Sequence, residues 1–175
     1  DICINLVGIL FEQKKGNTFN NIHSIFPSLL AKLSKEYNLK HFIHLSALGI
    51  NDALDSDYAK SKLEGENKVL KNFPLATILR PSIVYSVDDN FTTNFMTLLN
   101  RLPIFPLYYE GKTRFAPIHC SDLTDTIHYI ISNNVYSKII ECVGPEEITF
   151  KELLEKLLNL IEKKKITYTS TSTSC

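Results

Sequence analysis

The chain has 175 residues, of which 44% are hydrophobic and 22% charged, and its 19 basic residues balance 19 acidic ones. This composition predicts a soluble globular chain with a hydrophobic core. The lack of net charge argues against nucleic acid or an anionic membrane surface as a partner. No apolar run reaches the roughly 18 residues expected of a membrane span, so we expect no direct span.

The chain begins at Asp1 and enters an apolar run at once. This start predicts a fragment whose N-terminal part is missing, and such a fragment would leave part of a sheet uncovered and tend to aggregate. The cysteines show neither a CxxC motif nor metal-ligand spacing, and neither His23 nor His119 has an acidic residue or cysteine at ligand spacing. We therefore expect reduced thiols, a cytoplasmic-type protein and no metal site.

Residues 2–7 form a short apolar run that Gly8 closes. This pattern predicts a parallel strand buried on both faces. Asn5 lies inside the run and needs a hydrogen-bond partner there.

A helix is predicted over residues 18–37 because apolar residues recur at helical spacing. Pro27 predicts a kink or break in it, and Asn38 its end. The residues expected on its buried face are Phe19, Ile22, Ile25, Phe26, Leu29, Leu30 and Leu33.

Strands at 41–46 and 75–80 flank a predicted helix over 58–71, and the second strand stops at Pro81. His44 alternates with inward apolar residues, which predicts a packed or hydrogen-bonded histidine. The alternation of short strands and amphipathic helices predicts an α/β fold, a doubly wound parallel sheet with helices on both faces.

The pattern loosens after Tyr85. We expect a helix over 90–99, an aromatic and proline-rich connection over 102–109, and a helix over 122–132 with Ser121 as its N-cap. A strand at 138–143 and a last helix after Thr149 follow, and the low-complexity residues 167–175 are expected to be disordered.

Tyr58 and Lys62 stand at i and i+4 of a predicted helix and therefore share a face. A nearby ammonium would lower the phenol pKa from its usual value near 10. A tyrosine so tuned can exchange a proton with a carbonyl or alcohol while a nicotinamide moves the hydride. Ser46 adds a hydroxyl at a strand end. The alternatives are an ordinary exposed i,i+4 pair for Tyr58 and Lys62, and a strand-end cap for Ser46.

Several motifs, taken in order, resemble the short-chain dehydrogenase/reductase superfamily in its extended and atypical branch, and within it the nucleotide-binding accessory subunits of respiratory complex I and their bacterial relatives. They are Asn5 to Leu10, Ile43 to Gly49, Tyr58-x-x-x-Lys62 with Glu64-Gly65-Glu66, Leu79 to Tyr85, Leu102-Pro103, Gly111 to Phe115, Pro117 to Leu123, and Gly144 to Phe150.

The resemblance implies a Rossmann-like fold that binds NAD or NADP. Tyr58 and Lys62 match the Tyr and Lys of the active-site motif, Ser46 is the candidate for the catalytic hydroxyl, and Lys62 would also bond the nicotinamide ribose. Cofactor contacts are expected from the segment after the first strand and the turn after Pro81, together with the active-site residues. The expected cofactor-binding residues are Asn5, Leu6, Val7, Gly8, Ser46, Tyr58, Lys62, Pro81, Ser82 and Ile83.

Three departures from the family are visible. The phosphate loop and the residue that selects NAD or NADP are not in the chain. Ala47 and Leu48 stand where extended members usually carry the catalytic hydroxyl, and Tyr85-Ser86 replace an aromatic residue and a glycine. Arg114 and His119 are expected either over a substrate or partner site or simply at the surface.

The resemblance divides the chain into 1–89, the C-terminal part of a Rossmann domain, a substrate-side lobe over 90–166, and the tail 167–175. It implies a complex I accessory subunit-like protein that holds a dinucleotide structurally, placed in the cytoplasm or on the matrix side of a mitochondrion, at the membrane only through a partner. The alternative is an epimerase, dehydratase or reductase of a nucleotide sugar or small carbonyl compound. A third possibility is a redox-sensing regulator.

Overall fold

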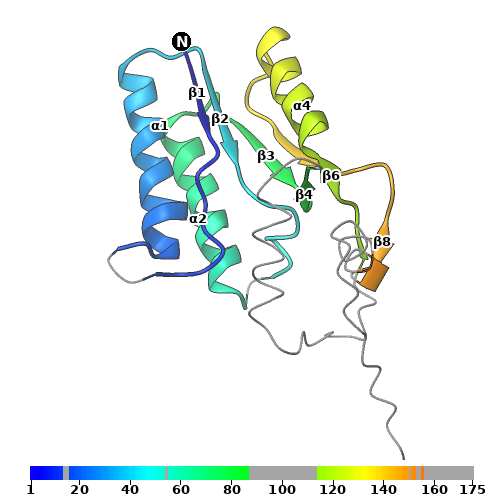
Figure 1. The fold of residues 1–175 in the computed structure, drawn as a ribbon. Helices are drawn as coiled ribbons and strands as arrows, with labels where there is room; N and C mark the ends of the chain where they lie inside the picture. Colours follow the sequence, from blue (N-terminus) through cyan, green and yellow to red (C-terminus); the bar gives the residue numbers. More distant parts are fainter. Residues whose placement is uncertain (14–15, 54, 87–113, 150, 153–154, 156–175) are drawn as a thin grey trace, which may run out of the picture.

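A computed structural model describes residues 1–13, 16–53, 55–86, 114–149, 151–152 and 155 (Figure 1). The helix predicted over 90–99, the connection over 102–109, most of the last predicted helix and the tail 167–175 lie outside the described residues.

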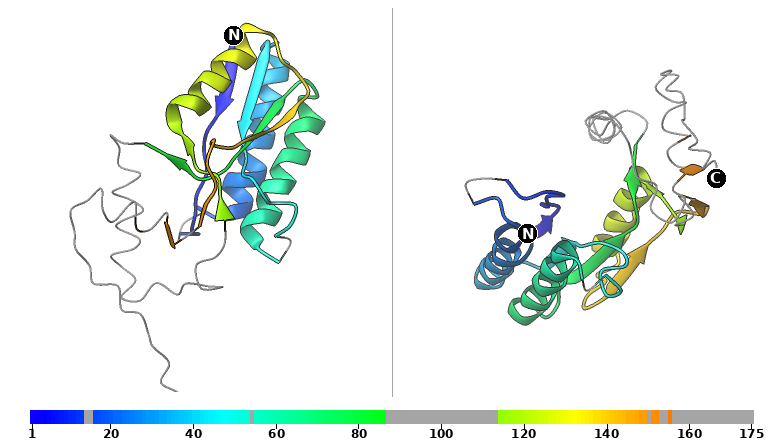
Figure 2. Two further views of the ribbon diagram at one scale, coloured as in Figure 1. Left: turned by 90° about the vertical axis from the view of Figure 1, so that its right-hand side faces the viewer. Right: turned by 90° about the horizontal axis from the view of Figure 1, so that it is seen from below.

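The centre of the fold is a parallel sheet with the strand order β1-β2-β3-β7. Its strands are β1 (Ile2–Asn5), β2 (His41–Leu45), β3 (Thr77–Pro81) and β7 (Ile139–Cys142). Helices α1 (Phe26–Glu36) and α2 (Asp57–Asn72) lie on one side of this sheet, and α4 (Cys120–Ser132) lies on the other (Figures 1 and 2). The predicted doubly wound, Rossmann-like α/β fold is confirmed.

Two hydrophobic clusters fill the two sides of the sheet, because successive strand residues point to opposite faces. Phe42 and Ile78 pack under α1 and α2, and Ile43 and Leu79 pack under α4. The first cluster is completed by Ala31, Val69, Phe73 and Ala76, and the second by Ile118, Leu123, Ile130 and Cys142.

Two small sheets lie beyond the carboxyl ends of the central strands. Strand β4 (Val84–Tyr85) pairs in parallel with β6 (Ile118–His119), and β5 (Arg114–Phe115) pairs antiparallel with β8 (Ile148–Thr149). Among the residues that are described, no helix combines the length and apolar character that crossing a bilayer requires.

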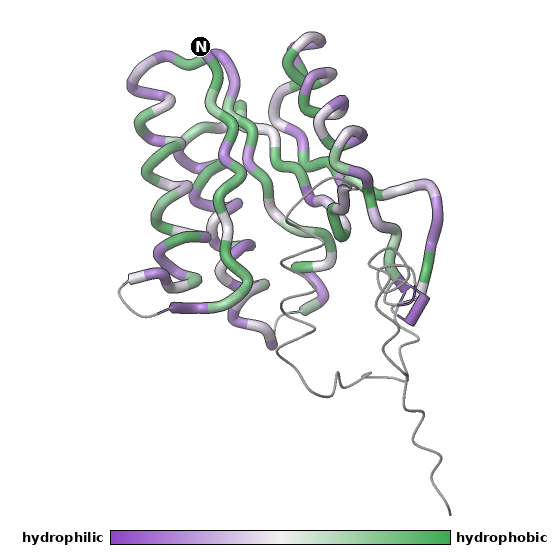
Figure 3. Tube along the Cα trace, in the orientation of Figure 1, coloured by the Kyte–Doolittle hydropathy of each residue, from purple (hydrophilic) through white to green (hydrophobic). Residues whose placement is uncertain are grey.

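Strand β1 differs from its prediction. It ends at Asn5, and Ile2 and Ile4 are each 41% exposed, so the strand is not buried on both faces. It lies at the edge of the described sheet and pairs only with β2 there. Hydrophobic residues dominate β1 and the segment after it (Figure 3).

The first helical region also differs. A π-helix, η1 (Asn20–Ile25), precedes α1, and the two meet beside Pro27, where the sequence predicts a break. Ile25, Leu29 and Leu33, predicted to be buried, are exposed. Small and polar residues form the buried side instead: His23, Ser24, Pro27, Ala31 and Ser34.

Close packing against α2 explains this exchange of faces. A Cβ at Gly65 would overlap the backbone carbonyl oxygen of His23, so η1 and α2 touch backbone to backbone. Asn72 Nδ2 donates to both the carbonyl oxygen and Oγ of Ser28, at 3.2 and 2.9 Å. Large apolar side chains do not fit such an interface and point outward.

Helix α4 begins two residues earlier than the sequence suggests. Its N-cap is His119, which is extended (φ −71°, ψ 144°) and whose Nδ1 accepts a hydrogen bond from the Ser121 N–H at 3.3 Å. The assignment of Ser121 as the N-cap is therefore wrong, because Ser121 lies within the helix. Helix α2, by contrast, is capped conventionally by Ser56, whose Oγ accepts from Ala59 N–H at 3.4 Å.

Candidate functional site

Asn5 and His44 meet at the carboxyl ends of β1 and β2, because the register pairs these two positions. Asn5 Oδ1 accepts from the Val7 N–H at 3.1 Å, so its Nδ2 is the group that donates to His44 Nδ1 at 3.0 Å. The expected partner of Asn5 and the expected hydrogen bond of His44 are both confirmed. The neutral His44 ring then carries its proton on Nε2.

Ser46 follows β2 directly, and its backbone N–H donates to the Leu79 carbonyl at 2.7 Å. Its Oγ and the Nε2 of His44 are buried and have no hydrogen-bond partner within the described part of the chain. Both residues lie at the carboxyl end of β2, His44 within the strand and Ser46 directly after it. Buried polar atoms are normally paired, so these two atoms mark a place suited to polar ligand groups.

Tyr58 and Lys62 share a face of α2, as predicted, with Lys62 Nζ 6.0 Å from the centre of the Tyr58 ring. The Lys62 side chain is buried, and its Nζ donates to the Leu45 carbonyl at 3.3 Å. A Cβ at Gly8 would lie 3.2 Å from that Nζ. The structure therefore brings the segment after β1, the end of β2 and the α2 pair together.

The electrostatics of Lys62 and Tyr58 differ from the sequence-based expectation. Burial lowers the pKa of Lys62 from 10.5 to about 8, against an opposing effect of Glu66. Burial also raises the pKa of Tyr58, whereas we expected the ammonium to lower it. That expectation is wrong for this structure because desolvation of the phenol outweighs an ammonium that is turned toward a backbone carbonyl.

His23 also belongs to the site, a role that the sequence did not predict. Its Nε2 accepts from the Ile9 N–H at 3.0 Å, and its Nδ1 lies 3.0 Å from Ser61 Oγ. Its ring stacks on Phe19 and meets the edge of Tyr58 at 5.2 Å. The available signal was a pair of polar residues, His23 and Ser24, inside an apolar helical pattern.

The histidines stay neutral near pH 7. Burial, followed by the nearby Lys62, lowers the pKa of His23 to about 4 and that of His44 to about 3. Lys62, with a pKa of about 8, is therefore the group of this cluster that carries a positive charge at pH 7. The described residues contain no cluster of three or more His, Cys, Asp or Glu side chains that could hold a metal ion.

A buried ion pair fixes α2 against the sheet. Arg80 Nε and Nη2 donate to Glu66 Oε1 and Oε2 at 2.9 and 2.7 Å. Arg80 Nη2 also approaches Asn51 Oδ1 at 3.5 Å. Glu66 lies one turn after Lys62, so this pair holds the helix face that carries Tyr58 and Lys62.

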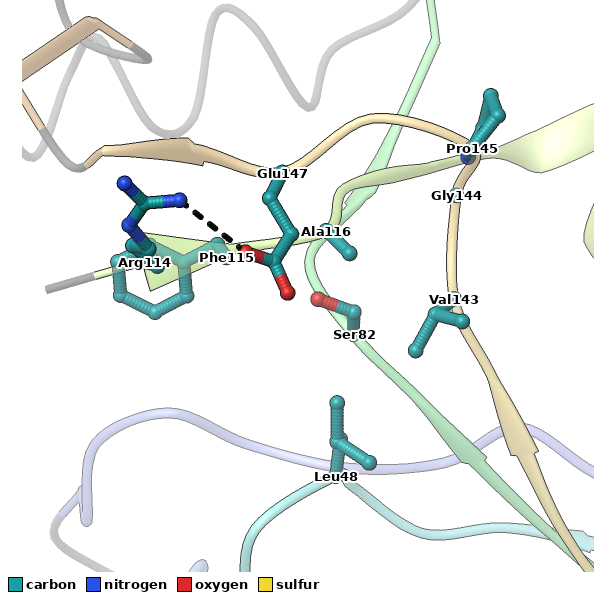
Figure 4. A pocket seen from close by; sticks show the side chains of 9 residues that line it. All are labelled: Leu48, Ser82, Arg114, Phe115, Ala116, Val143, Gly144, Pro145 and Glu147. Atoms are coloured by element: carbon teal, nitrogen blue, oxygen red, sulfur yellow. Dashed lines mark hydrogen bonds and ion pairs between the residues drawn. The ribbon is translucent and has the colours of Figure 1, made fainter.

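A cavity of about 440 Å³ opens beyond the carboxyl ends of β3 and β7 (Figure 4). Leu48 and Ser82 point into it, and the ion pair between Arg114 Nη1 and Glu147 Oε2, 3.3 Å long, lies at another side. Its lining residues are Leu48, Ser82, Arg114, Phe115, Ala116, Val143, Gly144, Pro145 and Glu147.

The remaining predicted site residues are spread between these two places. Leu6 and Val7 are exposed, at 58% and 47%. Pro81 ends β3 and is buried, and Ser82 and Ile83 are half-buried. Tyr58 and Lys62 do not line the cavity.

Comparison with known proteins gives no matching family model. The chain is 29% identical over 161 residues to the mitochondrial NADH dehydrogenase [ubiquinone] 1 alpha subcomplex subunit 9 of Dictyostelium discoideum, covering 91% of this chain and 44% of that protein. It is 28% identical over 170 residues to the mouse protein of that name, covering 96% and 45%. The chain thus spans less than half the length of these relatives.

Solved structures share the fold. A dTDP-4-dehydrorhamnose reductase ortholog from Clostridium acetobutylicum matches with a TM-score of 0.70 at 19% identity, over 91% of this chain and 61% of that chain. The UDP-glucuronic acid 4-epimerase of Bacillus cereus in complex with NAD matches with a TM-score of 0.70 at 22% identity, over 94% and 60%. These relatives confirm the similarity that the motifs predicted, and the solved structures show the Rossmann-like fold.

Proposed function

We propose that the chain is part of a dinucleotide-binding protein similar to the NADH dehydrogenase subunits it matches, and that it holds NAD or NADP mainly as a structural ligand. The observation that carries this proposal is the buried Lys62 ammonium beside Gly8. A side chain at position 8 would fill the space next to Nζ, whereas glycine leaves it open to a ligand.

The residues fit a dinucleotide on two further observations. Ser46 Oγ is buried and unpaired among the described residues, and Lys62 Nζ has only a long bond, 3.3 Å, to the Leu45 carbonyl. Both groups can therefore bind ribose hydroxyls at little cost to the fold. In this proposal Lys62 and Tyr58 hold the nicotinamide ribose.

The other contacts follow the strand ends. The Asn5–Gly8 segment would hold the adenine-side ribose and phosphates, and the Pro81–Ile83 turn would hold the nicotinamide carboxamide. The bound dinucleotide would supply hydride transfer, and this chain's residues would bind it and place a phenol proton beside it. Ligands of parallel α/β sheets bind at the carboxyl ends of the strands, which is where these groups lie.

A structural role is favoured over turnover by the chemistry around Tyr58. Its pKa is raised, so it stays a neutral phenol at pH 7, and Ala47 and Leu48 provide no hydroxyl where extended family members usually have one. Binding to the folded state alone stabilises it by mass action, by about 2.7 kcal/mol at a ligand concentration of 100 Kd. The relatives' names support NADH dehydrogenase subunits as partners and the mitochondrion as the location.

The experiment that tests binding compares two lysine variants of the full-length protein. Lys62→Met should weaken binding of NADH and NADPH about tenfold or more, because a charge-assisted hydrogen bond contributes about 1.5–3 kcal/mol. The control is Lys32→Met, whose side chain is 65% exposed on α1. Equal affinities in both variants would refute the proposed site, and native gels probed for NADH dehydrogenase subunits would test the assembly.

A second function is favoured by one observation, the shared face of Tyr58 and Lys62. In this alternative the protein is an NAD(P)-dependent epimerase, dehydratase or reductase of a nucleotide sugar or small carbonyl compound. Tyr58 would exchange the proton with the substrate, and Lys62 would hold the phenol and the ribose in place. The structural neighbours include a reductase and an epimerase, which supports the fold but not the substrate.

A further inference from the structure

The His23 ring connects two segments of the proposed dinucleotide site, the segment after β1 and helix α2. On one side it contacts Ile9, which follows Gly8 in the segment after β1. On the other it contacts Ser61 of α2, between Tyr58 and Lys62. Helix α2 lies directly beside η1 and α1 (Figure 1), so His23 sits where these elements converge.

The hydrogen bonds define the role of each ring atom. The Ile9 N–H can only donate, so Nε2 must be the acceptor, and the neutral ring therefore carries its proton on Nδ1. That Nδ1–H donates to Ser61 Oγ at 3.0 Å, and the Ser61 hydroxyl donates to the Tyr58 carbonyl at 2.7 Å. An unbroken series of directed hydrogen bonds thus runs from the Ile9 N–H to the first turn of α2.

Aromatic contacts fix the plane of the ring. Phe19 stacks on it at 5.4 Å with an angle of 17° between the planes, and Tyr58 meets it edge-on at 5.2 Å and 86°. The ring is 1% exposed. The titratable groups around it are Lys62, Tyr58 and His44, and the first of these lowers its proton affinity.

The position of Gly8 shows what this connection controls. A Cβ there would lie 3.7 Å from His23 Nε2 and 3.2 Å from Lys62 Nζ. His23 therefore borders the same small space as the ammonium. If the Ile9 bond were lost, the segment could move relative to Lys62 without any change in the sheet.

We infer that His23 is a positioning residue that sets the spacing between the Gly8–Ile9 segment and the Tyr58–Lys62 face of α2, and thereby the affinity for a dinucleotide. This inference rests on the proposed function. It goes beyond it by assigning a role to His23, a buried residue of the π-helix η1. Single π-helical turns inside helices often occur at functional sites.

Two substitutions separate positioning from simple core packing. In His23→Gln the amide oxygen can reach the position of Nε2 and keep the Ile9 bond. In His23→Asn the shorter side chain reaches only the position of Nδ1, so the Ile9 bond is lost while the Ser61 bond is kept. His41→Asn is the matched control, since His41 is also buried and lies at the other end of β2, stacked on Tyr136.

The experiment measures NADH affinity by fluorescence, hydrogen exchange of the Ile9 amide and thermal stability, all in the full-length protein at pH 7.5. We expect His23→Asn to weaken NADH binding about tenfold and to speed Ile9 exchange by a similar factor, as loss of one hydrogen bond predicts. His23→Gln should stay within about threefold of the wild type in both. His41→Asn should lower stability without changing affinity.

Three results would overturn the inference. Equal affinity losses in His23→Gln and His23→Asn would mean that His23 only fills space, and an affinity loss in His41→Asn would mean that stability alone governs binding. Unchanged hydrogen exchange of the Ile9 amide in His23→Asn would refute the positioning role, whether or not the wild-type protein binds a dinucleotide. Absence of wild-type binding with accelerated Ile9 exchange would instead refute the proposed function and confine His23 to holding the segment.

Discussion

Arg80 of β3 and Glu66 of α2 face each other through two parallel hydrogen bonds of 2.9 and 2.7 Å, both side chains being almost completely buried. A bidentate pair of this kind fixes the angle as well as the distance between its partners. It ties the helix that carries Tyr58 and Lys62 to the strand that leads to Pro81 and Ser82.

Removing one partner should be costly. Glu66→Gln should lower the free energy of unfolding by about 3–5 kcal/mol, because it leaves the Arg80 charge buried and unpaired. The control is Glu36→Gln, which breaks the exposed Lys32–Glu36 pair. This variant should change the free energy of unfolding by no more than about 0.5 kcal/mol. Urea unfolding measures both, and similar small effects would show that Arg80 finds another partner such as Asn51.

Gly65 should not tolerate a methyl group. Gly65→Ala would place a Cβ against the His23 carbonyl oxygen, and forcing η1 away from α2 should destabilise the protein by about 1–3 kcal/mol. Alanine is otherwise the better helix former by about 1 kcal/mol, so the predicted sign is opposite to that of helix propensity. Thermal unfolding of Gly65→Ala beside Lys71→Ala, an exposed position of α2, checks this; a stabilised Gly65→Ala variant would contradict the packing.

Acid should weaken the fold through His23 and His44. Their pKa values in the folded protein are about 4 and about 3, below the usual 6.5. The unfolded chain therefore binds more protons below pH 6.5, and stability falls as pH drops from 6.5 towards these values, by about 1.4 kcal/mol per unit for each histidine. Above pH 6.5 this contribution is constant.

Urea unfolding at pH 7.5, 6.0 and 5.0 measures the effect. Carboxylates titrate in the same region, so the comparison is with His44→Asn, whose amide oxygen can reach the position of Nδ1 and still accept from Asn5. This variant should have a shallower slope between pH 6.0 and 5.0 than the wild type. Parallel slopes would mean that His44 does not titrate differently in the two states.

Tyr58→Phe separates the two proposed functions. The hydroxyl has no hydrogen bond among the described residues and its pKa is raised, so the variant should keep its fold, and its NADH affinity should fall by no more than about tenfold, as loss of one hydrogen bond to the ribose predicts. If the protein is an enzyme, turnover should disappear. Unchanged turnover in a substrate screen would exclude Tyr58 as the proton donor, and tight binding without turnover in both proteins would favour the structural cofactor.

Local patterns were sufficient to predict the four strands of the central sheet, the helices between them and the shared face of Tyr58 and Lys62, but not the short strands β4, β5, β6 and β8. Period-two and helical spacing are properties of neighbouring residues, so they can be read from a sequence without knowing what packs against them. The partner of Asn5 could be expected in kind, since a polar side chain within a strand requires one, but His44 lies 39 residues away.

The buried side of α1 and the role of His23 could not be predicted in this way. The apolar residues Ile25, Leu29 and Leu33 indicate a buried stripe, but the helix turns its small side chains inward because α2 approaches so closely at Gly65. His23 depends on contacts with Ile9 and Ser61, 14 and 38 residues distant. The raised pKa of Tyr58 likewise follows from burial by tertiary packing, which the spacing of Tyr58 and Lys62 does not contain.

The pairing of β3 with β7 has a consequence for the order of events in folding. Strands β1, β2 and β3 and their helices all come from the first 81 residues, whereas β7 begins only at Ile139. Closing so long a loop costs chain entropy before any strand contact compensates for it. The sheet should therefore assemble from β1 towards β3 first, and β7 should add last and set the slowest rate.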